Sequence, residues 1–247
     1  MDRKISISVN VEENSCLANT IASNKKHLIN ELTIIGYYSS NLDGEFLRSM
    51  CNSLDVDGHR TGGRLEKIDL SQAQLRSSAS QKCNTQEISS DEFKDCITLR
   101  EVVLSELISI NAEAFSGCIS LQSIDYKGSH VFQSLKGVLY RVGKWECLPS
   151  DYRKFTSHQK YLVKYPSAKQ DTRDIDFDNV TLIEDYAFED FCGTDLYLPL
   201  VPPTLTSLAF YNVDVTKVRI HVPQGSFSSY WSHPVWQDFQ IIEDNNV

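Results

Sequence analysis

One stretch of this chain carries the same amino-acid pattern twice, with a spacing of 22 residues. Each copy runs Ile-x4-Phe-x2-Cys-x2-Leu-x2-Val/Ile, and the matched pairs are Ile88/Ile110, Phe93/Phe115, Cys96/Cys118, Leu99/Leu121 and Val102/Ile124. A fixed period of this length is typical of a solenoid, a coil of stacked repeats. One such repeat cannot bury its apolar face alone, so the stacking of neighbours has to supply the core.

Within each copy, the pattern predicts a compact turn or short helix followed by a short strand. The segment Leu-x-x-Ile-x-Leu places alternate side chains on the same face of a strand. Phe and Cys are often buried, so we interpret Phe93, Cys96 and their copies as internal ladders. The expected fold is an α/β repeat, a leucine-rich-repeat solenoid with a parallel strand ladder on one side, short helices or turns on the other, and a small antiparallel insertion.

The same period continues outside the two clear copies. It relates Ile183/Leu205, Ala187/Ala209 and Phe188/Phe210, which are again 22 residues apart. Cys192 comes one residue later than the pattern requires, and we interpret it as a core thiol next to a local bulge. Further strands are expected at Ile29–Ile34, Leu65–Leu70, Leu196–Leu198 and Val218–Ile220.

Five segments depart from the period. The alternating apolar residues of Ile5–Val11 predict an edge strand. Asp43–Met50 is typical of a helix, with Asp43 as its N-cap. Ser71–Glu87 is polar and predicts an exposed loop. Phe132–Val163 predicts a small antiparallel excursion, and the aromatic tail from Val222 to Ile242 is expected to cover the open end of the core.

The repeat, written I-x-x-x-A-F-x-x-C-x-x-L-x-x-I-x-L, resembles the BspA-like leucine-rich repeat, the Treponema pallidum type. Further stretches resemble segments of that family, namely its opening at Glu31–Met50, a hairpin motif at Lys136–Tyr140, a repeat start at Val180–Phe188 and a closing segment at Val222–Phe239. Together they cover nearly the whole chain and are similar to a short bacterial surface member of the family.

These segments fit one elongated domain over residues 1–247. Its expected parts are an N-terminal cap with a first irregular repeat at 1–63, repeats at 64–130, an irregular hairpin insertion at 131–180, repeats at 181–221 and a C-terminal cap at 222–247.

Composition argues against several classes of function. The formal net charge is −9, whereas binding to nucleic acid needs clustered Lys and Arg. No run of about 18 apolar residues is present, so no membrane-spanning helix is expected. The seven cysteines are an odd number and include no Cys-x-x-Cys, which argues against a disulfide framework and a zinc site.

No set of residues matches a catalytic, cofactor-binding or metal-binding motif. The six histidines lack the spacing of helical metal ligands and stand in no nucleophile motif. The acidic stretch Asp171–Asp178 lacks the ligand spacing and the glycine of an EF-hand, so a solvated turn is favoured over a calcium site. We therefore expect no enzyme activity, no catalytic residue, no cofactor and no metal.

Solenoids bind partners through their extended surfaces, so the outward positions of the predicted strands are the best candidates for a site. They form two neighbouring rows: Thr33, Asp69, Val103, Asp125, Tyr197 and Arg219, and beside them Glu31, Lys67, Glu101, Ser123, Asp195 and Lys217. The partner-binding candidates are Asp69, Asp125, Tyr197 and Arg219, and Tyr and Arg are enriched at binding hot spots. Trp145, in the aromatic insertion, is a fifth candidate.

The resemblance implies a non-enzymatic, adhesion-type binding module on the bacterial cell surface, whose partner is a protein of a host or of another cell. Glycan binding through the aromatic insertion and a role as an envelope scaffold are the alternatives. The segment Met1–Asn10 lacks the apolar core of a signal peptide. The resemblance favours a secreted protein or lipoprotein whose leader has been removed, while a cytoplasmic location stays open.

Overall fold

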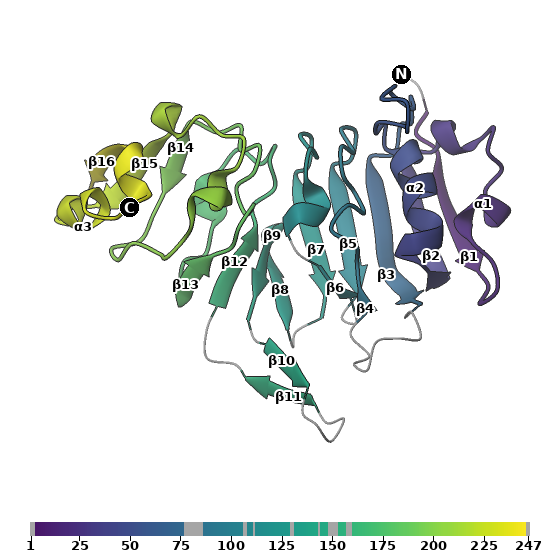
Figure 1. The fold of residues 1–247 in the computed structure, drawn as a ribbon, viewed down its shortest axis with the longest axis horizontal. Helices are drawn as coiled ribbons and strands as arrows, with labels where there is room; N and C mark the ends of the chain where they lie inside the picture. The colour runs from purple at the N-terminus through teal and green to yellow at the C-terminus, as the bar shows by residue number, and fades with distance from the viewer. Residues whose placement is uncertain are drawn as a thin grey trace.

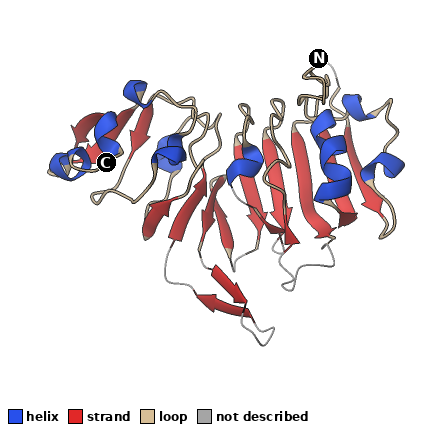
Figure 2. Cartoon of the chain, in the orientation of Figure 1, coloured by secondary structure: helices blue, strands red, loops and turns tan. Residues whose placement is uncertain are grey.

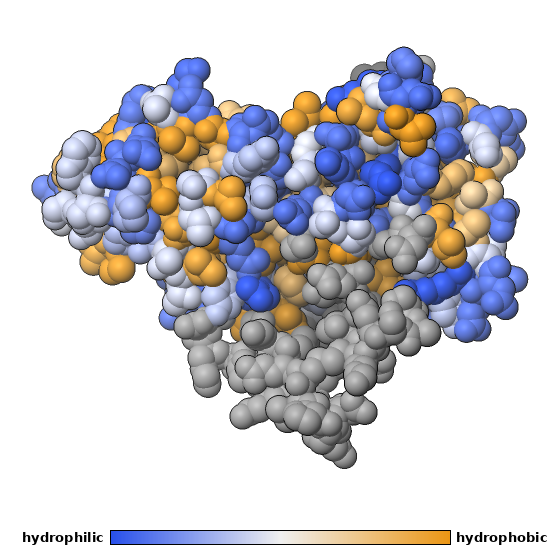
Figure 3. Space-filling model, viewed as in Figure 1, coloured by the Kyte–Doolittle hydropathy of each residue, from blue (hydrophilic) through white to orange (hydrophobic). Residues whose placement is uncertain are grey.

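The computed structural model describes residues 3–76, 86–105, 108–110, 112–128, 131–142, 144–147, 153–156 and 160–245. Its elements follow one another along an elongated arc, with the two termini near opposite ends (Figure 1). Most of the regular structure is strand, and the helices are short (Figure 2). None of the helices in these ranges is long and apolar enough to span a membrane. On the face drawn in Figure 3, hydrophobic residues form separate patches among hydrophilic ones.

The N-terminal half is built on a five-stranded parallel sheet. The strands are, in spatial order, β1 (Ser6–Val11), β2 (Glu31–Tyr38), β3 (Lys67–Leu75), β5 (Glu101–Ser105) and β7 (Ser123–Lys127). Leu32, Ile68, Val102 and Ile124 are partners on successive strands, and all four are buried. The predicted inward row of the repeat is therefore confirmed, and so is the edge strand at the N-terminus. The two-residue strands β4 (Gln86–Glu87) and β6 (Ile108–Ser109) form a separate parallel pair.

Short helices lie between the strands along the chain. They include α1 (Leu17–Thr20), η1 (Lys26–Leu28), α2 (Ser40–Met50), η2 (Ala112–Phe115), η3 (Thr172–Asp174), η4 (Ser207–Phe210) and η5 (Val215–Lys217). With 11 residues, α2 is the longest of these, and its side chains Leu47 and Met50 are buried. The other helices are single turns, so their stability depends on packing against neighbouring repeats.

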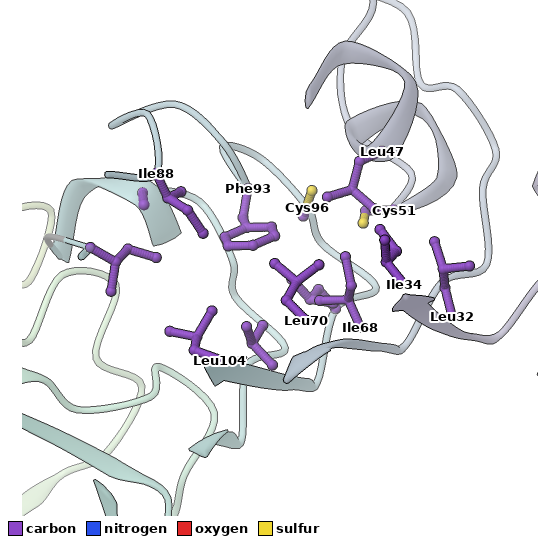
Figure 4. Close-up of a cluster of buried hydrophobic side chains, with 14 of the residues drawn as sticks. Leu32, Ile34, Leu47, Cys51, Ile68, Leu70, Ile88, Phe93, Cys96 and Leu104 are labelled. Atoms are coloured by element: carbon purple, nitrogen blue, oxygen red, sulfur yellow. The ribbon is translucent and has the colours of Figure 1, made fainter. Parts of the chain in front are cut away.

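The rings that recur with the period stack on one another inside the molecule. Phe93 and Phe115 stack with ring centroids 5.5 Å apart, and Phe188 stacks on Phe210 at 4.8 Å. Cys96 and Cys118 are fully buried beside the first pair. The predicted Phe and Cys ladders are thus confirmed in these repeats. Figure 4 shows Phe93 and Cys96 among the leucine and isoleucine side chains of the sheet.

The residue two positions after each repeat phenylalanine adopts the same backbone conformation. Its φ is 58° at Asp95, 72° at Gly117, 56° at Asp190 and 59° at Asn212. This left-handed region is strained for most residues and tolerated by Gly, Asn and Asp. The choice of Asp, Gly, Asp and Asn at this position is therefore a local sequence requirement of the turn.

The middle of the chain forms the predicted antiparallel insertion. A four-stranded sheet has the spatial order β13 (Val180–Ile183), β12 (Lys160–Lys164), β9 (Val138–Arg141) and β8 (Phe132–Leu135). The pairs β8–β9 and β9–β12 are antiparallel, and the parallel arrangement returns between β12 and β13. A second antiparallel pair, β10 (Lys144–Cys147) and β11 (Arg153–Thr156), projects from the arc (Figure 1).

The C-terminal end is a three-stranded parallel sheet covered by an aromatic tail. Its strands are β14 (Asp195–Tyr197), β15 (Arg219–Pro223) and β16 (Gln240–Asp244), and α3 (Phe227–Trp231) and η6 (Trp236–Asp238) lie between the last two in sequence. Tyr230 and Trp236 are fully buried, and the indole of Trp236 donates a hydrogen bond to the Pro203 carbonyl at 3.1 Å. The tail thus packs Tyr230 and Trp236 onto the last repeats, as its sequence predicted, whereas Trp231 is exposed.

Two sequence predictions in the N-terminal half are wrong. The helix begins at Ser40 rather than at Asp43, and Ser39 is its N-cap. Asp43 is buried inside the helix, where its carboxylate accepts hydrogen bonds from the backbone N–H groups of Leu17 at 2.7 Å and Ser39 at 2.9 Å. The segment predicted as a loop from Ser71 is strand as far as Leu75, because β3 continues its pairing with β2. Residues 77–85 of that predicted loop lie outside the described ranges.

Two predictions in the C-terminal half are also wrong. Cys192 is exposed, because Phe191 is buried in its place and packs against Phe188. The alignment of Val218–Ile220 with the other strands is shifted by two residues, since Leu196 pairs with Ile220 and not with Val218. Packing of the larger Phe191 ring into the core accounts for the exposure of Cys192. Pairing between β14 and β15 sets the two-residue shift in the alignment.

A buried charged pair lies where the insertion rejoins the repeats. Lys164 stands before the ladder ring Tyr165, at the position that Ala187 occupies before Phe188. Its fully buried ammonium donates to the Tyr186 carbonyl at 2.9 Å and lies 3.8 Å from the carboxylate of Glu189. Desolvation by burial lowers the pKa of Lys164 and raises the pKa of Glu189. Lys164 therefore depends on Glu189 for the compensation of its charge, whereas Glu189 also accepts hydrogen bonds from Ser116.

We expect Glu189→Gln to lower the free energy of unfolding by roughly 3 kcal/mol, because it leaves the buried Lys164 ammonium without its anion. The double variant Lys164→Met/Glu189→Gln should recover most of this loss. Chemical unfolding of the two single variants and the double variant measures the coupling. The exposed Glu45→Gln serves as the control and should change stability little. Simple addition of the two single losses in the double variant would contradict the proposed dependence.

Candidate binding surface

Outward polar side chains gather on the parallel sheet at the C-terminal end. Asp195 on β14 lies opposite Arg219 on β15, and Tyr197 lies opposite His221. Leu196 stands between Asp195 and Tyr197 on β14 and is fully buried. Because successive side chains of a strand point to opposite faces, burial of Leu196 fixes Asp195 and Tyr197 on the outer face.

Asp195 joins the polar groups of this surface. Its Oδ2 atom lies 2.6 Å from Nη2 of Arg219, and its Oδ1 atom lies 2.7 Å from Nε2 of His221. Thr194 donates a further hydrogen bond to Oδ2 at 2.8 Å. On the other side of the imidazole ring, Nδ1 lies 3.5 Å from a carboxylate oxygen of Asp244 on β16. The carboxylate thus holds the Arg219 guanidinium and the imidazole of His221 in place.

Tyr197 is held between two flat groups. Its ring stacks on the imidazole of His221 with centroids 4.5 Å apart and an interplanar angle of 19°. The guanidinium of Arg173, beside β14, lies 3.7 Å from the centroid of the tyrosine ring and also donates to its hydroxyl. We call Arg173, Asp195, Tyr197, Arg219 and His221 the strand-side cluster.

The neighbouring groups of the cluster lower the pKa of the Asp195 carboxyl. Burial alone would raise the pKa of Asp195, but hydrogen bonds from Arg219, His221 and Thr194 outweigh it and lower the pKa to about 2 from 3.8. A lowered pKa in the folded state means that the ionised carboxylate stabilises the fold. The surface side of the cluster stays accessible, since the Arg219 side chain is 47% exposed.

The other predicted strand residues lie on the N-terminal sheet. Asp69 and Asp125 lie in the predicted outward row on either side of Val103, which is buried rather than exposed as predicted. The carboxylate of Asp69 accepts a hydrogen bond from the Ser71 backbone at 2.8 Å, and Asp69 lines a small hollow of about 140 Å³ with Lys67. Asp125 pairs with Lys127. These two residues therefore belong to a polar row separate from the strand-side cluster.

Trp145 belongs to β10, where its backbone pairs with that of Phe155. Its side chain lies outside what the structure describes. The described aromatic residues of the insertion include Tyr140 and Tyr161. Tyr140 is fully buried and belongs to the core, and Tyr161 lies under the guanidinium of Arg141, 4.7 Å from its ring centroid.

The sequence interpretation missed His221 and Arg173. Arg219 and His221 alternate with the buried Ile220 and Val222, so the alternation itself could have placed His221 outward. The two-residue error in register instead aligned Arg219 with Tyr197. It also placed Lys217 on the strand, whereas Lys217 lies in η5 and pairs with Asp214 at 2.8 Å. Arg173 reaches the cluster from η3, and no local pattern marks it.

The acidic residues that the structure describes include one group close enough to share a metal ion. In the described ranges, Asp55, Asp57 and His59 are the group whose ligand atoms lie close enough to share an ion, and all three are exposed in a loop. In the acidic stretch noted in the sequence, Asp174 pairs with Lys136 at 2.9 Å and with Lys169 at 2.8 Å.

The repeated strands and the ladders define a leucine-rich-repeat protein made mostly of strands. Residues 69–138 match the family model described as BspA type leucine rich repeat region (6 copies). The resemblance noted in the sequence is therefore confirmed: the chain carries BspA-type leucine-rich repeats.

The solved structures that match the chain include a leucine rich cell surface protein from Faecalibacterium prausnitzii A2-165, which is 11% identical. The alignment covers 95% of this chain and 82% of that chain, with a TM-score of 0.27. No curated protein matches the chain.

Asp195→Asn should lower stability at neutral pH by about 1–2 kcal/mol, because it removes the charge from hydrogen bonds made by Arg219 and His221. The folded pKa of Asp195 lies below its usual value, so its contribution is present above about pH 4 and disappears as the pH falls toward 2. Thermal melts across that range should show a smaller acid loss for the variant than for the wild type. The exposed Asp57→Asn is the control, and an acid loss unchanged by Asp195→Asn would contradict this role.

Proposed function

We propose that this protein is a non-enzymatic binding module whose strand-side cluster contacts a protein partner. The observation that carries the proposal is the fixed, outward arrangement of Tyr197 and Arg219 around Asp195. Tyr and Arg are enriched among the residues that dominate binding energies at protein interfaces. The ion pair and the ring stacking order these side chains before binding, which reduces the entropy lost when a partner is bound.

The remaining strand candidates extend this surface in the proposal. Asp69 and Asp125 would contribute polar contacts at the N-terminal sheet, where they share an outward row. We also treat residues 1–247 as one elongated solenoid, with the parts predicted from the sequence. The continuous parallel pairing from β1 to β7 and the return of parallel strands from β12 onward support that interpretation.

The proposed location is the cell surface, and the proposed role is adhesion to a host protein or to a protein of another cell. Both rest on the BspA-type repeats found in the chain. Glycan binding through Trp145 and a role as an envelope scaffold remain the alternative proposals. They differ from adhesion in the partner that the protein binds, so a binding experiment separates them.

The location can be measured first. Intact source cells are treated with a protease that cannot enter them, and the protein is followed by antibody beside a cytoplasmic control protein. We expect digestion of this protein while the control survives, because an adhesion module has to face the medium. Survival of both proteins until lysis would count against the surface proposal.

Replacement of Asp125, Tyr197 and Arg219 by alanine should weaken binding to a protein partner at least tenfold, since two of these residues supply the expected hot spot. Purified wild type and variant are compared on arrays of host matrix proteins, cell-surface proteins and glycans. A matched control replaces the exposed residues Lys25, Asp57 and Phe227, which lie outside both outward rows. Equal binding by a folded triple variant would reject the site, and binding to glycans that is lost on Trp145→Ala would favour the alternative.

A further inference from the structure

A concave surface lies on the turn side of the repeats, apart from the strand-side cluster. This turn groove has a volume of about 590 Å³ and is lined by turns from both halves of the chain. Asp95 and Gly117 come from the N-terminal repeats, and Asp190 and Tyr211 from the C-terminal ones. A further hollow of about 490 Å³ continues it, because Glu113 and Tyr186 line both. The combined space is larger than a single small ion needs.

The lining of the turn groove is acidic. It contains the carboxylates Asp91, Asp95, Glu113, Glu189 and Asp190 against the two cations Arg60 and Lys94. The buried Lys164 balances Glu189, which leaves four carboxylates facing two cations. The side chains of Asp95 and Glu113 accept no hydrogen bond from the described residues. An unpaired carboxylate in a hollow favours a cationic ligand over a neutral one, because a neutral ligand would remove water from the charge without compensating it.

An aromatic and apolar wall lies beside these carboxylates. The rings of Tyr186 and Tyr211 meet edge to face with centroids 5.6 Å apart. Tyr211 is 53% exposed and Ile119 is 54% exposed, so both offer apolar surface to a ligand. Tyr186 has a φ of 62°, a conformation that is strained for a bulky residue and is found at binding sites more often than elsewhere.

Arginine already pairs with tyrosine twice in this molecule. The guanidinium of Arg173 lies 3.7 Å from the ring centroid of Tyr197, and that of Arg141 lies 4.7 Å from the ring centroid of Tyr161. Arginine combines this stacking with hydrogen bonds to carboxylates through the same planar group. A ligand that carries guanidinium groups would therefore fit both parts of the turn groove.

We propose that the turn groove binds a basic, extended polypeptide segment. Its Arg or Lys side chains pair with Asp95 and Glu113, and its backbone and apolar atoms pack on Tyr211 and Ile119. The site is separate from the strand-side cluster, so it stands whether or not that cluster binds a partner. The protein would then hold two partners, or two parts of one partner, on opposite sides of its strands.

The full chain is titrated into a fluorescein-labelled hexapeptide of alternating Arg and Gly, and anisotropy is followed at low salt and at about 0.15 M salt. We expect Asp95→Asn/Glu113→Gln to weaken binding at least tenfold and Tyr211→Ala to weaken it about fivefold. Asn tolerates the positive φ of residue 95, so the double variant should fold. The control Glu13→Gln/Glu45→Gln removes two exposed charges outside the turn groove and should stay within twofold of the wild type.

Three results would overturn the proposal. The first is equal weakening by the control pair, which would show general attraction to a chain of net charge −9. The second is binding of a neutral chitohexaose that is insensitive to Asp95→Asn/Glu113→Gln, which would identify a glycan site. The third is failure of the Arg-Gly peptide to bind more tightly than its Glu-Gly counterpart. If the double variant does not fold, the single variants Glu113→Gln and Tyr211→Ala are compared in the same way with the wild type and the control pair.

Discussion

The structure depends on the stacking of one repeat on the next. A single repeat has one ring and one short strand, and neither can be buried without a neighbour. The stacked pairs Phe93–Phe115 and Phe188–Phe210 meet this need on the turn side, and the row from Leu32 to Ile124 meets it in the sheet. Every outward position then follows, because the buried residues fix the orientation of the residues between them.

At two positions the repeat has a charged residue before its ladder ring, although the ring itself still stacks on the next one. Glu92 precedes Phe93 and is fully buried with the hydroxyl of Tyr38, and Lys164 precedes Tyr165 and is buried near Glu189. Both positions mark a junction. The first lies where the α2 segment meets the repeats, and the second lies where the antiparallel insertion ends. At each junction the buried charged residue requires its particular partner, because loss of that partner would leave a buried polar group uncompensated.

The repeat architecture leaves two surfaces with different chemistry. On the strand side, neighbouring strands bring Asp195, Arg219 and His221 into contact and hold Tyr197 in a fixed orientation. On the turn side, the left-handed turn position brings Asp95 and Asp190 to a common groove. The first surface is an ordered set of paired charges, and the second has carboxylates that the described residues leave unpaired. The two surfaces therefore suit different ligands.

The period, the inward row of the N-terminal sheet, the ring ladders, the paired thiols Cys96 and Cys118 and the BspA-type repeat could be predicted from the sequence, because each of these is a local pattern repeated along the chain. The same patterns indicated Tyr197 and Arg219, yet they could not place His221 opposite Tyr197 or Arg173 above it. Those contacts depend on strand register and on a helix 24 residues away, which only the packed structure sets. The core position next to Cys192 could not be predicted from the sequence either. Phe191 rather than Cys192 is buried there, because the larger ring fills the volume that the neighbouring repeats leave.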